Sequence, residues 1–375
     1  MTSRKHFIAS GAALLGASVV PACSPNAPDK NYAAAVSRIW QPLDAAAMPQ
    51  GLGNAHQSPE LAGELVRCAT LAPSSHNTQC WKFLVAGQQV AILPDTMRRC
   101  PAVDPDDHHL FVSLGCAAEN LAQAAMAHGL VTQVRLDTTA GDRVAIALAP
   151  TRAVTSPLYA AMATRQCTRG EFNGQLVTLS ELQLLEQAGT GDGVRMVMLT
   201  GRSAMENVLA LVTQGNTVQL HDAAFMAELT SWIRFNAADA VAFSDGLYSG
   251  LSGNPSLPRW LGRRMLKVFL KPGSDNDKYA RQVRSSAGLA IFISSASDKA
   301  HWVETGRCYQ RFALQAAALG IRNAMLNQAV EVPALRQQLA SFMGTPKQRP
   351  DLVVRFGRGP LMQRSLRRPV EAVMV

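Results

Sequence analysis

The sequence is poor in several features that would assign it to a familiar class of protein. Of its 375 residues only 6% are aromatic and 17% are charged, and none of its seven cysteines forms a Cys-x-x-Cys pair. It has no zinc-finger spacing and no RNP-like run, which argues against nucleic-acid binding. It has no Gly-x-Ser-x-Gly elbow, which argues against an α/β-hydrolase. The N-terminal apolar stretch, residues 7–22, is shorter than the roughly 20 residues of a comfortable transmembrane helix.

The remaining composition describes a globular chain with a sizeable core. Hydrophobic residues make up 47% of the sequence, and the length predicts two to three domains. The net charge of +9 favours an anionic partner. Because lysine and arginine are scattered and aromatics are few, a phosphate-bearing cofactor explains the local basic clusters better than a nucleic acid does.

Residues 1–23 have the features of an export signal. A basic start at Arg4 and Lys5 precedes the apolar stretch, as in secretory signals. Residues 3–8, Ser-Arg-Lys-His-Phe-Ile, resemble a twin-arginine export signal with lysine in place of the second arginine, so the general secretory route stays open. Residues 20–23, Val-Pro-Ala-Cys, resemble a lipoprotein signal. Cleavage near Ala22 with Cys23 incidental is an equal alternative. We therefore expect an exported, periplasmic protein, with membrane attachment only through a lipid on Cys23.

Residues 24–57 are predicted to be a linker, and residue 58 begins the folded part. Ser58, Pro59 and Glu60 form a good helix start, and apolar residues then recur at helical spacing. A short polar turn follows, and residues 83–86 and 89–93 have strand patterns. Asp106 and Asp107 are expected to cap a second helix over residues 108–129. Most cysteines lie in apolar helical patterns, which favours buried free thiols, although an oxidising compartment would permit disulfides.

The chain contains an internal similarity that indicates two related halves. Residues 115–130, GCAAENLAQAAMAHGL, resemble residues 306–321, GRCYQRFALQAAALGI, at an offset of 191 positions. The helix starts at residues 58–61 and 179–182 are offset by only 121. The difference of 70 residues predicts an insertion in the second half, at about 225–285. Such a long insertion is usually functional, and Trp232 and Trp260 within it are candidates to pack over a pocket mouth as part of a lid.

Three segments carry the chemistry. Residues 72–83 read Ala-Pro-Ser-Ser-His-Asn-Thr-Gln-Cys-Trp-Lys-Phe, a turn rich in donors and acceptors between a helix and a strand. Residues 165–172 read Arg-Gln-Cys-Thr-Arg-Gly-Glu-Phe, and residues 364–369 read Arg-Ser-Leu-Arg-Arg-Pro. The planar fork of arginine suits bidentate binding of phosphate oxygens.

The acidic and histidine-rich stretch at 104–109 is a weaker candidate, for a metal site. A helix-capping loop explains this stretch better, and we predict no metal.

These segments resemble motifs of the nitroreductase family. Residues 73–81 resemble its Pro-Ser-x-x-Asn-x-Gln-Pro-Trp signature, with Cys80 in place of proline. The resemblance implies an FMN site. Ser74, Ser75, Asn77 and Gln79 are implied to contact the ring or the ribityl chain, and the arginines to contact the phosphate. Backbone donors near Asn327 are implied to face the ring from the other half. The implied cofactor-binding residues are Ser74, Ser75, Asn77, Gln79, Arg165, Arg169, Asn327, Arg367 and Arg368. No residue is implied to act as a nucleophile.

The distribution of the motifs implies a fused pseudo-dimer. The family binds FMN between two subunits, whereas here the turn lies in one half and Arg165 and Arg169 lie in the other. Residues 232–234 and 245–247 also resemble the Acg-type branch of the family. The predicted fold is therefore α+β, with two nitroreductase-like halves at 58–150 and 151–375, each with helices against an antiparallel or mixed sheet, in a monomeric pseudo-dimer with one surviving FMN site.

The implied function is that of an FMN-dependent oxidoreductase. Hydride would pass to a small acceptor such as a nitroaromatic or a quinone, with NAD(P)H or another donor as reductant. An FMN-binding protein that sequesters the cofactor without turnover is the alternative. A periplasmic lipoprotein for another ligand would be colourless, so an absorption spectrum separates it from the other two.

Overall fold

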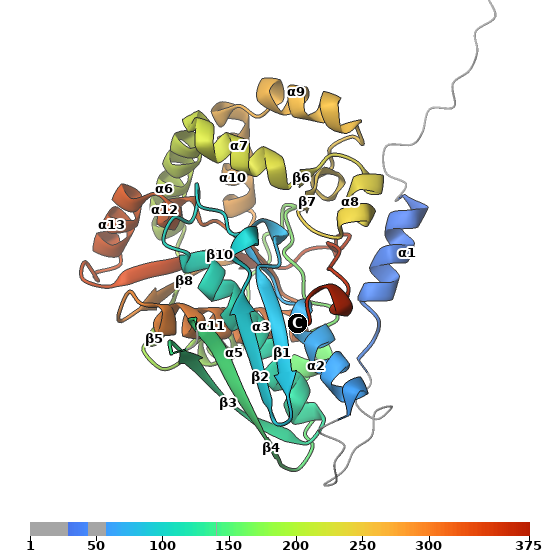
Figure 1. Cartoon of the computed structure of the whole chain (residues 1–375). Coiled ribbons are helices and arrows are strands. Elements are labelled where there is room, and N and C mark those ends of the chain that lie inside the picture. Colours follow the sequence, from blue (N-terminus) through green and yellow to red (C-terminus); the bar gives the residue numbers. More distant parts are fainter. Residues whose placement is uncertain (1–28, 44–57, 140) are drawn as a thin grey trace, which may run out of the picture.

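The computed structural model describes residues 29–43, 58–139 and 141–375 (Figure 1). The predicted export signal and Cys23 lie outside these ranges. The six cysteines within them are all free; five are buried, as expected, and Cys167 is exposed. By length and hydropathy one helix, His108–Ala127, would be able to cross a membrane, but 83% of its apolar window is buried inside the protein, as in a central core helix.

The two halves have the same sheet topology. The first half contains α2 (Pro59–Thr70), η3 (Ser75–Asn77), β1 (Trp81–Ala86), β2 (Gln89–Pro94), η4 (Thr96–Arg98), α3 (His108–Ala127), β3 (Leu130–Asp137) and β4 (Arg143–Pro150). The corresponding elements of the second half are α5 (Leu179–Gly189), β5 (Val194–Leu199), β8 (Gly288–Ser294), α11 (Lys299–Ala318), β9 (Arg322–Met325) and β10 (Arg349–Gly357). Both sheets are antiparallel, in the orders β1-β2-β4-β3 and β5-β8-β10-β9. The predicted α+β class is confirmed.

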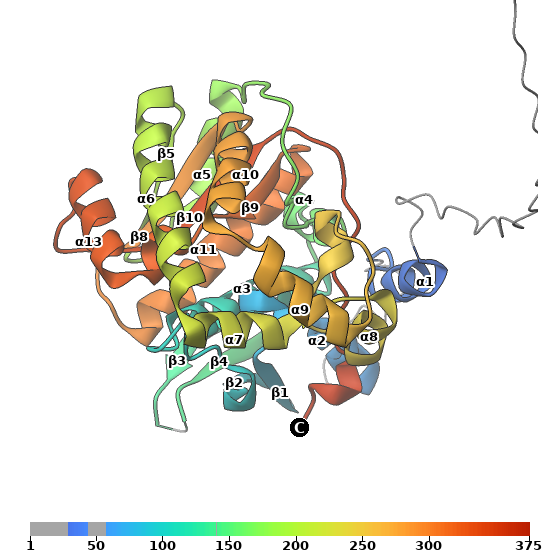
Figure 2. The ribbon, with the colours of Figure 1, turned by 90° about the horizontal axis from the view of Figure 1, so that it is seen from above.

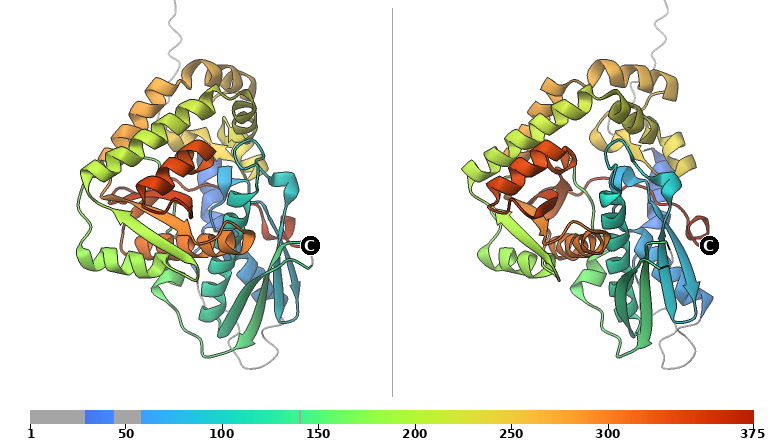
Figure 3. Two further views of the ribbon diagram at one scale, coloured as in Figure 1. Left: turned by 90° about the vertical axis from the view of Figure 1, so that its left-hand side faces the viewer. Right: turned by 60° about the vertical axis from the view of Figure 1, so that its left-hand side comes forward.

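The centre of the molecule is the pair α3 and α11, which lies between the two sheets (Figure 3). Each helix has 20 residues, and their starts are 191 positions apart, which is the offset of the sequence similarity. Gly115 and Gly306 lie at the crossing. A Cβ atom on Gly115 would overlap the Val303 carbonyl oxygen, and one on Gly306 would overlap the Val112 carbonyl oxygen. These reciprocal contacts give the halves an approximate two-fold relation.

Local signals account for several element boundaries. The Ser58 side chain accepts a hydrogen bond from the Leu61 N–H at the start of α2, and Thr178 with Glu181 forms a capping box at the start of α5. The cap of α3 differs from the prediction. Its first N–H groups, at His109 and Leu110, donate to the carboxylate of Asp104 rather than to Asp106 or Asp107.

The second half contains a long insertion. Two residues join β1 to β2, whereas residues 200–287 separate β5 from β8; we call this segment the insertion, and the predicted range of 225–285 lies within it. It is largely helical and forms the upper part of the molecule in Figure 1, and it is seen from above in Figure 2. Its elements are α6 (Arg202–His221), α7 (Ala223–Trp232), β6 (Ile233–Arg234), α8 (Ala237–Phe243), β7 (Leu247–Tyr248), η5 (Ser249–Ser252), α9 (Arg259–Phe269) and α10 (Pro272–Arg284).

Two peripheral segments tie the halves together. The C-terminal residues add to the edge of the first sheet, where the Phe83 N–H donates to the Val373 carbonyl oxygen at 2.7 Å. Part of the predicted linker forms α1 (Lys30–Ile39), which packs on the same C-terminal segment through Tyr32 and Trp40. The linker prediction is therefore wrong for this part, because two buried aromatic side chains anchor it. The remaining elements are α4 (Pro157–Ala161), α12 (Gln328–Glu331), α13 (Pro333–Phe342) and η6 (Val370–Ala372).

Candidate functional site

The polar turn of the first half has a strained backbone. Three residues that are not glycine, His76, Asn77 and Gln79, have positive φ angles of 47°, 53° and 54°. Such conformations are uncommon outside glycine and persist where the surroundings hold them. Here the Ser74 hydroxyl accepts the Gln79 N–H at 2.9 Å and closes the turn.

The amides of Asn77 and Gln79 are committed to other parts of the protein. Asn77 donates to the carbonyl oxygens of Gly246 and Leu366, and Gln79 donates to that of Ser244 at 2.9 Å. The Gln79 carbonyl oxygen of the side chain accepts the Arg368 N–H at 2.7 Å. Both amides therefore fasten the turn to the insertion and to the C-terminal segment.

Arg367 is a second predicted ligand residue with its donors already used. Its guanidinium donates to the carbonyl oxygens of Thr70, Leu71 and Ala72, which end helix α2, and its remaining donors go to Asn77 and to the Leu366 carbonyl oxygen; these five hydrogen bonds use all five N–H groups. Burial and the nearby charge of Arg165 lower the pKa of Arg367 to about 9. Arg367 therefore adds positive charge to the site and holds the turn, without offering a free donor.

Residues 165–168, in contrast to Arg367, have buried side-chain donors without hydrogen-bond partners. Arg165 is 2% exposed and donates one hydrogen bond, at 3.0 Å to the Leu71 carbonyl oxygen. Its Nε and Nη1 atoms are buried without a partner, as are Gln166 Nε2 and Thr168 Oγ1. An unpartnered buried donor costs about 1–3 kcal/mol, and most native structures pair such groups. Three neighbouring side chains with orphaned donors therefore indicate a site for an acceptor-rich ligand.

Positive charge is concentrated at the same place. The charge of Arg165 also contributes, after burial, to a lowered pKa of Arg364, and Arg364 and Arg367 lie 5.3 and 5.2 Å from the centre of the Trp40 ring. Arg169 lowers the pKa of His76, which places its charge near the turn. We call Arg165, Arg169, Arg364 and Arg367 the arginine cluster. No ion pair involves any of the four within the described ranges. Arg165 and Arg367 are buried, Arg169 and Arg364 are partly buried, and like charges without a paired carboxylate fit an anion such as a phosphate.

The remaining predicted ligand residues lie in different surroundings. Ser75 is half-buried in the turn. The Asn327 side chain accepts the Val353 N–H at 3.1 Å and so pairs with strand β10. Arg368 donates to the carbonyl oxygens of Gln79 and Ala372. The structure thus brings Ser74, Ser75, Arg165 and Arg169 to one region. The side chains of Asn327 and Arg368 form hydrogen bonds with the backbone elsewhere in the protein.

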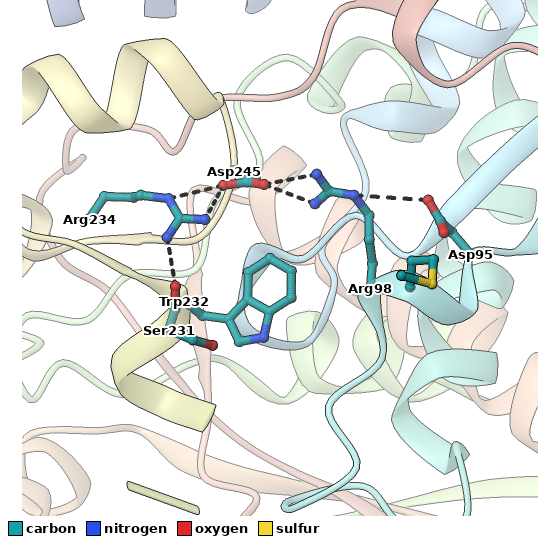
Figure 4. A pocket seen from close by; sticks show the side chains of 7 residues that line it. Asp95, Arg98, Ser231, Trp232, Arg234 and Asp245 are labelled. Atoms are coloured by element: carbon teal, nitrogen blue, oxygen red, sulfur yellow. Dashed lines mark hydrogen bonds and ion pairs between the residues drawn. The ribbon is translucent and has the colours of Figure 1, made fainter. Parts of the chain in front are cut away.

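A polar pocket of about 390 Å³ lies where the insertion meets the first half. Asp245 lies at its centre (Figure 4), between Arg98, whose Nη1 is 2.8 Å away, and Arg234, whose Nε is 3.0 Å away. Trp232 lies within 6 Å of both guanidinium groups. Arg98 also donates to the Thr78 carbonyl oxygen. The arginines here are paired with a carboxylate, so this pocket lacks the orphaned donors of residues 165–168.

The two tryptophans predicted to act together have different environments. Trp232 lines the pocket around Asp245, and its predicted role in a lid stays a prediction. Trp260 is 64% exposed on α9, so the prediction that it packs on a pocket mouth is wrong in this structure. The sequence alone could not distinguish the environment of Trp260 from that of Trp232.

We expect Asp245→Asn to loosen the insertion from the turn. The substitution weakens two charge-assisted pairs at once, so the free energy of unfolding should fall by about 2 kcal/mol. Cleavage by a protease within 233–248 should become faster. Asp277→Asn, at an exposed position in α10, is the matched control. Equal stability and equal cleavage rates for the two variants would show that the Arg98–Asp245–Arg234 group does not hold the insertion in place.

The acidic stretch at 104–109 has other partners. Asp104 caps α3, Asp106 pairs with Arg349 at 2.8 Å, and His108 pairs with Asp351 at 2.8 Å. His109 lies 3.5 Å from Glu331. The prediction of a capping loop is therefore better supported than a metal site built from these residues.

Sequence reasoning missed several residues around the cluster. Trp40 and Tyr32 lie in a segment without a motif, and Arg98 pairs with a residue 147 positions away. Arg364 belongs to the same basic run as Arg367, so this run could have identified Arg364 as a candidate site residue. Thr168, whose buried hydroxyl has no hydrogen-bond partner, follows Cys167 in the segment 165–172.

No protein-family model matches the chain. Among curated proteins, the chain is similar to two from Mycobacterium tuberculosis H37Rv. One, named "Putative NAD(P)H nitroreductase Rv3131", is 22% identical over 328 residues, which cover 84% of this chain and 89% of that protein. The other, named "Putative NAD(P)H nitroreductase acg", is 24% identical over 320 residues, which cover 82% and 93%. These similarities support the family that the motifs resemble.

Solved nitroreductase structures align with part of the chain. The FMN-dependent nitroreductase NfnB from Mycobacterium smegmatis, in complex with NADPH, covers 54% of this chain and 87% of its own, with 11% identity and a TM-score of 0.37. A nitroreductase with bound FMN from Desulfitobacterium hafniense covers 59% and 98%, with 14% identity and a TM-score of 0.35.

Proposed function

We propose that the protein is an FMN-dependent oxidoreductase of the nitroreductase type. The observation that carries the proposal is the set of buried, unpartnered donors on Arg165, Gln166 and Thr168, within an arginine cluster without carboxylates. These residues belong to the second half and lie against the polar turn of the first half, to which Arg165 is hydrogen-bonded at Leu71. The curated relatives carry names of the same activity.

The chain's own residues bind and orient the cofactor in this proposal. Arg165, Gln166 and Thr168 would donate to the phosphate oxygens, while Arg364 and Arg367 would supply charge. Ser74 and Ser75 would contact the polar parts of the ring system, and Asn77 and Gln79 hold the turn in its strained form. FMN, when bound, supplies the hydride chemistry that amino-acid side chains lack. The proposed acceptor is a small nitroaromatic or quinone-like molecule, and the proposed donor is NAD(P)H or another reductant.

We expect one FMN per chain. The place in the second half that corresponds to the polar turn is the short segment between α5 and β5, where a Cβ on Gly191 would overlap the side chains of Glu304, Cys308 and Arg311. That packing leaves no room for a second ring. Flavin released by denaturation should equal the protein concentration, and a ratio near two would contradict the single-site arrangement.

One specific feature favours a second candidate, an FMN-binding protein without turnover. The loop at 244–246 is hydrogen-bonded directly to Asn77 and Gln79, so the insertion closes over the turn. Anaerobic stopped-flow mixing with NADPH, followed by menadione, separates the two candidates. Reduction and reoxidation within seconds support the enzyme, and a flavin that stays oxidised with NADPH, NADH and dithionite-reduced mediators supports sequestration.

We also propose that the protein is exported to the periplasm, either soluble or anchored through a lipid on Cys23. The support is the sequence of residues 1–23 alone. Cell fractionation with Arg4→Ala and Cys23→Ala variants tests it. Retention of the Arg4→Ala variant in the cytoplasm supports export, and a shift of Cys23→Ala from the membrane to the soluble fraction supports the anchor.

A further inference from the structure

Three side chains of different chemistry meet beside the polar turn. His76 comes from the turn, Cys100 follows η4, and Glu228 lies on α7 in the insertion. One ligand atom from each lies within 4.8 Å of the other two. The His76 Nδ1 and Cys100 Sγ atoms are 3.6 Å apart. Imidazole, thiol and carboxylate from three separate segments therefore converge on one point.

The convergence is held by the surrounding structure. Both carboxylate oxygens of Glu228 accept backbone N–H groups, from Ala102 at 2.8 Å and from Val103 at 3.2 Å, which fixes the carboxylate while leaving lone pairs free. The positive φ of His76 belongs to the strained turn, and it is this backbone conformation that presents the ring to Cys100. Fixed carboxylates and oriented imidazoles are what metal sites require of their supporting groups.

Carboxylates gather around the point where the three groups meet. Besides Glu228, the carboxylates of Asp104 and Glu331 lie close enough to act electrostatically on Cys100. A divalent ion would compensate this concentration of acidic groups.

We propose that His76, Cys100 and Glu228 bind one divalent transition-metal ion, with zinc as the best fit. Zinc takes nitrogen, thiolate and carboxylate ligands at roughly 2.0–2.3 Å, which places tetrahedral ligand atoms roughly 3.4–3.8 Å apart. The His76–Cys100 distance of 3.6 Å already matches, and the Glu228 oxygen lies within 4.8 Å of both ligand atoms. Binding converts the thiol to a thiolate and releases its proton to solvent. Three protein ligands leave the fourth position for water or a small molecule.

The test uses cobalt as a spectroscopic probe for the site. Full-length protein is treated with a chelator and titrated with Co²⁺, both with and without FMN. We expect one Co²⁺ per chain, a near-ultraviolet thiolate-to-cobalt band, and its displacement by one equivalent of Zn²⁺. Cys100→Ser should abolish the band and weaken binding by at least about a hundred-fold, and Cys167→Ser, at the exposed cysteine, should leave both unchanged.

Two outcomes would overturn the proposal. Absence of the band in wild-type protein is one, and an unchanged band in Cys100→Ser is the other. Circular dichroism checks that the variant folds, and His76→Asn provides a second variant because asparagine tolerates a positive φ; it should weaken binding without abolishing the thiolate band. The result does not depend on flavin binding, so failure of the FMN proposal would leave this test intact.

Discussion

Arg165→Ala should weaken FMN binding by about ten-fold to a hundred-fold. The side chain has two buried atoms without partners, and hydrogen bonds to charged groups contribute about 1.5–3 kcal/mol. Riboflavin lacks the phosphate, so its affinity should change much less. Fluorescence titration of the flavin-free protein with each flavin measures both affinities.

The same substitution should not destabilise the flavin-free protein in proportion. The substitution removes only one hydrogen bond, to the Leu71 carbonyl oxygen, while two buried nitrogen atoms without partners disappear. We therefore expect the free energy of unfolding without FMN to stay within about 1 kcal/mol of wild type, or to rise. Arg152→Ala, exposed and earlier in the same connecting segment, is the matched control. Equal losses of FMN and riboflavin affinity would show that Arg165 does not bind the phosphate.

The helices around the site were predictable from the sequence because helix formation depends on patterns among neighbouring residues. The start of α2 followed from Ser58 and Pro59, and the offset of 191 positions identified α3 and α11 as equivalent helices. Two stretches far apart in the sequence, the turn and residues 165–168, were expected to meet, and Arg165 donates to the carbonyl oxygen of Leu71, the residue directly before the turn. Hydrophobic periodicity and helix capping can be recognised from a few neighbouring residues, which is why these elements were predicted.

The roles of single side chains were not predictable in the same way. Asn77 and Gln79 have the residue types expected of ring contacts, yet their amides hold Gly246 and Ser244 of the insertion. Arg367 and Arg165 look alike in the sequence, but Arg367 uses all five N–H groups in hydrogen bonds within the protein, whereas two nitrogen atoms of Arg165 have no partner. Such differences depend on partners more than 90 residues away, which no local pattern specifies.

The largest effect on stability is expected from Gly115→Ala. A methyl group at this position would overlap the carbonyl oxygen of Val303 on the facing helix, and backbone atoms cannot rotate away as a side chain does. The helices would have to separate at a buried crossing in the core. Overpacking of a core commonly costs 1–3 kcal/mol, and a backbone clash at a helix crossing belongs at the upper end, so we expect a loss of about 3 kcal/mol or more in urea-induced unfolding.

Gly63→Ala is the matched control for this change. Gly63 lies inside α2, and a Cβ there would have nothing within 4 Å. Alanine is favoured over glycine in a helix by about 0.5–1 kcal/mol, so this variant should be slightly more stable than wild type. The two identical substitutions should therefore shift the urea midpoint in opposite directions. A Gly115→Ala protein as stable as wild type would mean that α3 and α11 do not cross as closely as the structure has them, and the approximate two-fold relation between the halves would lose its main support.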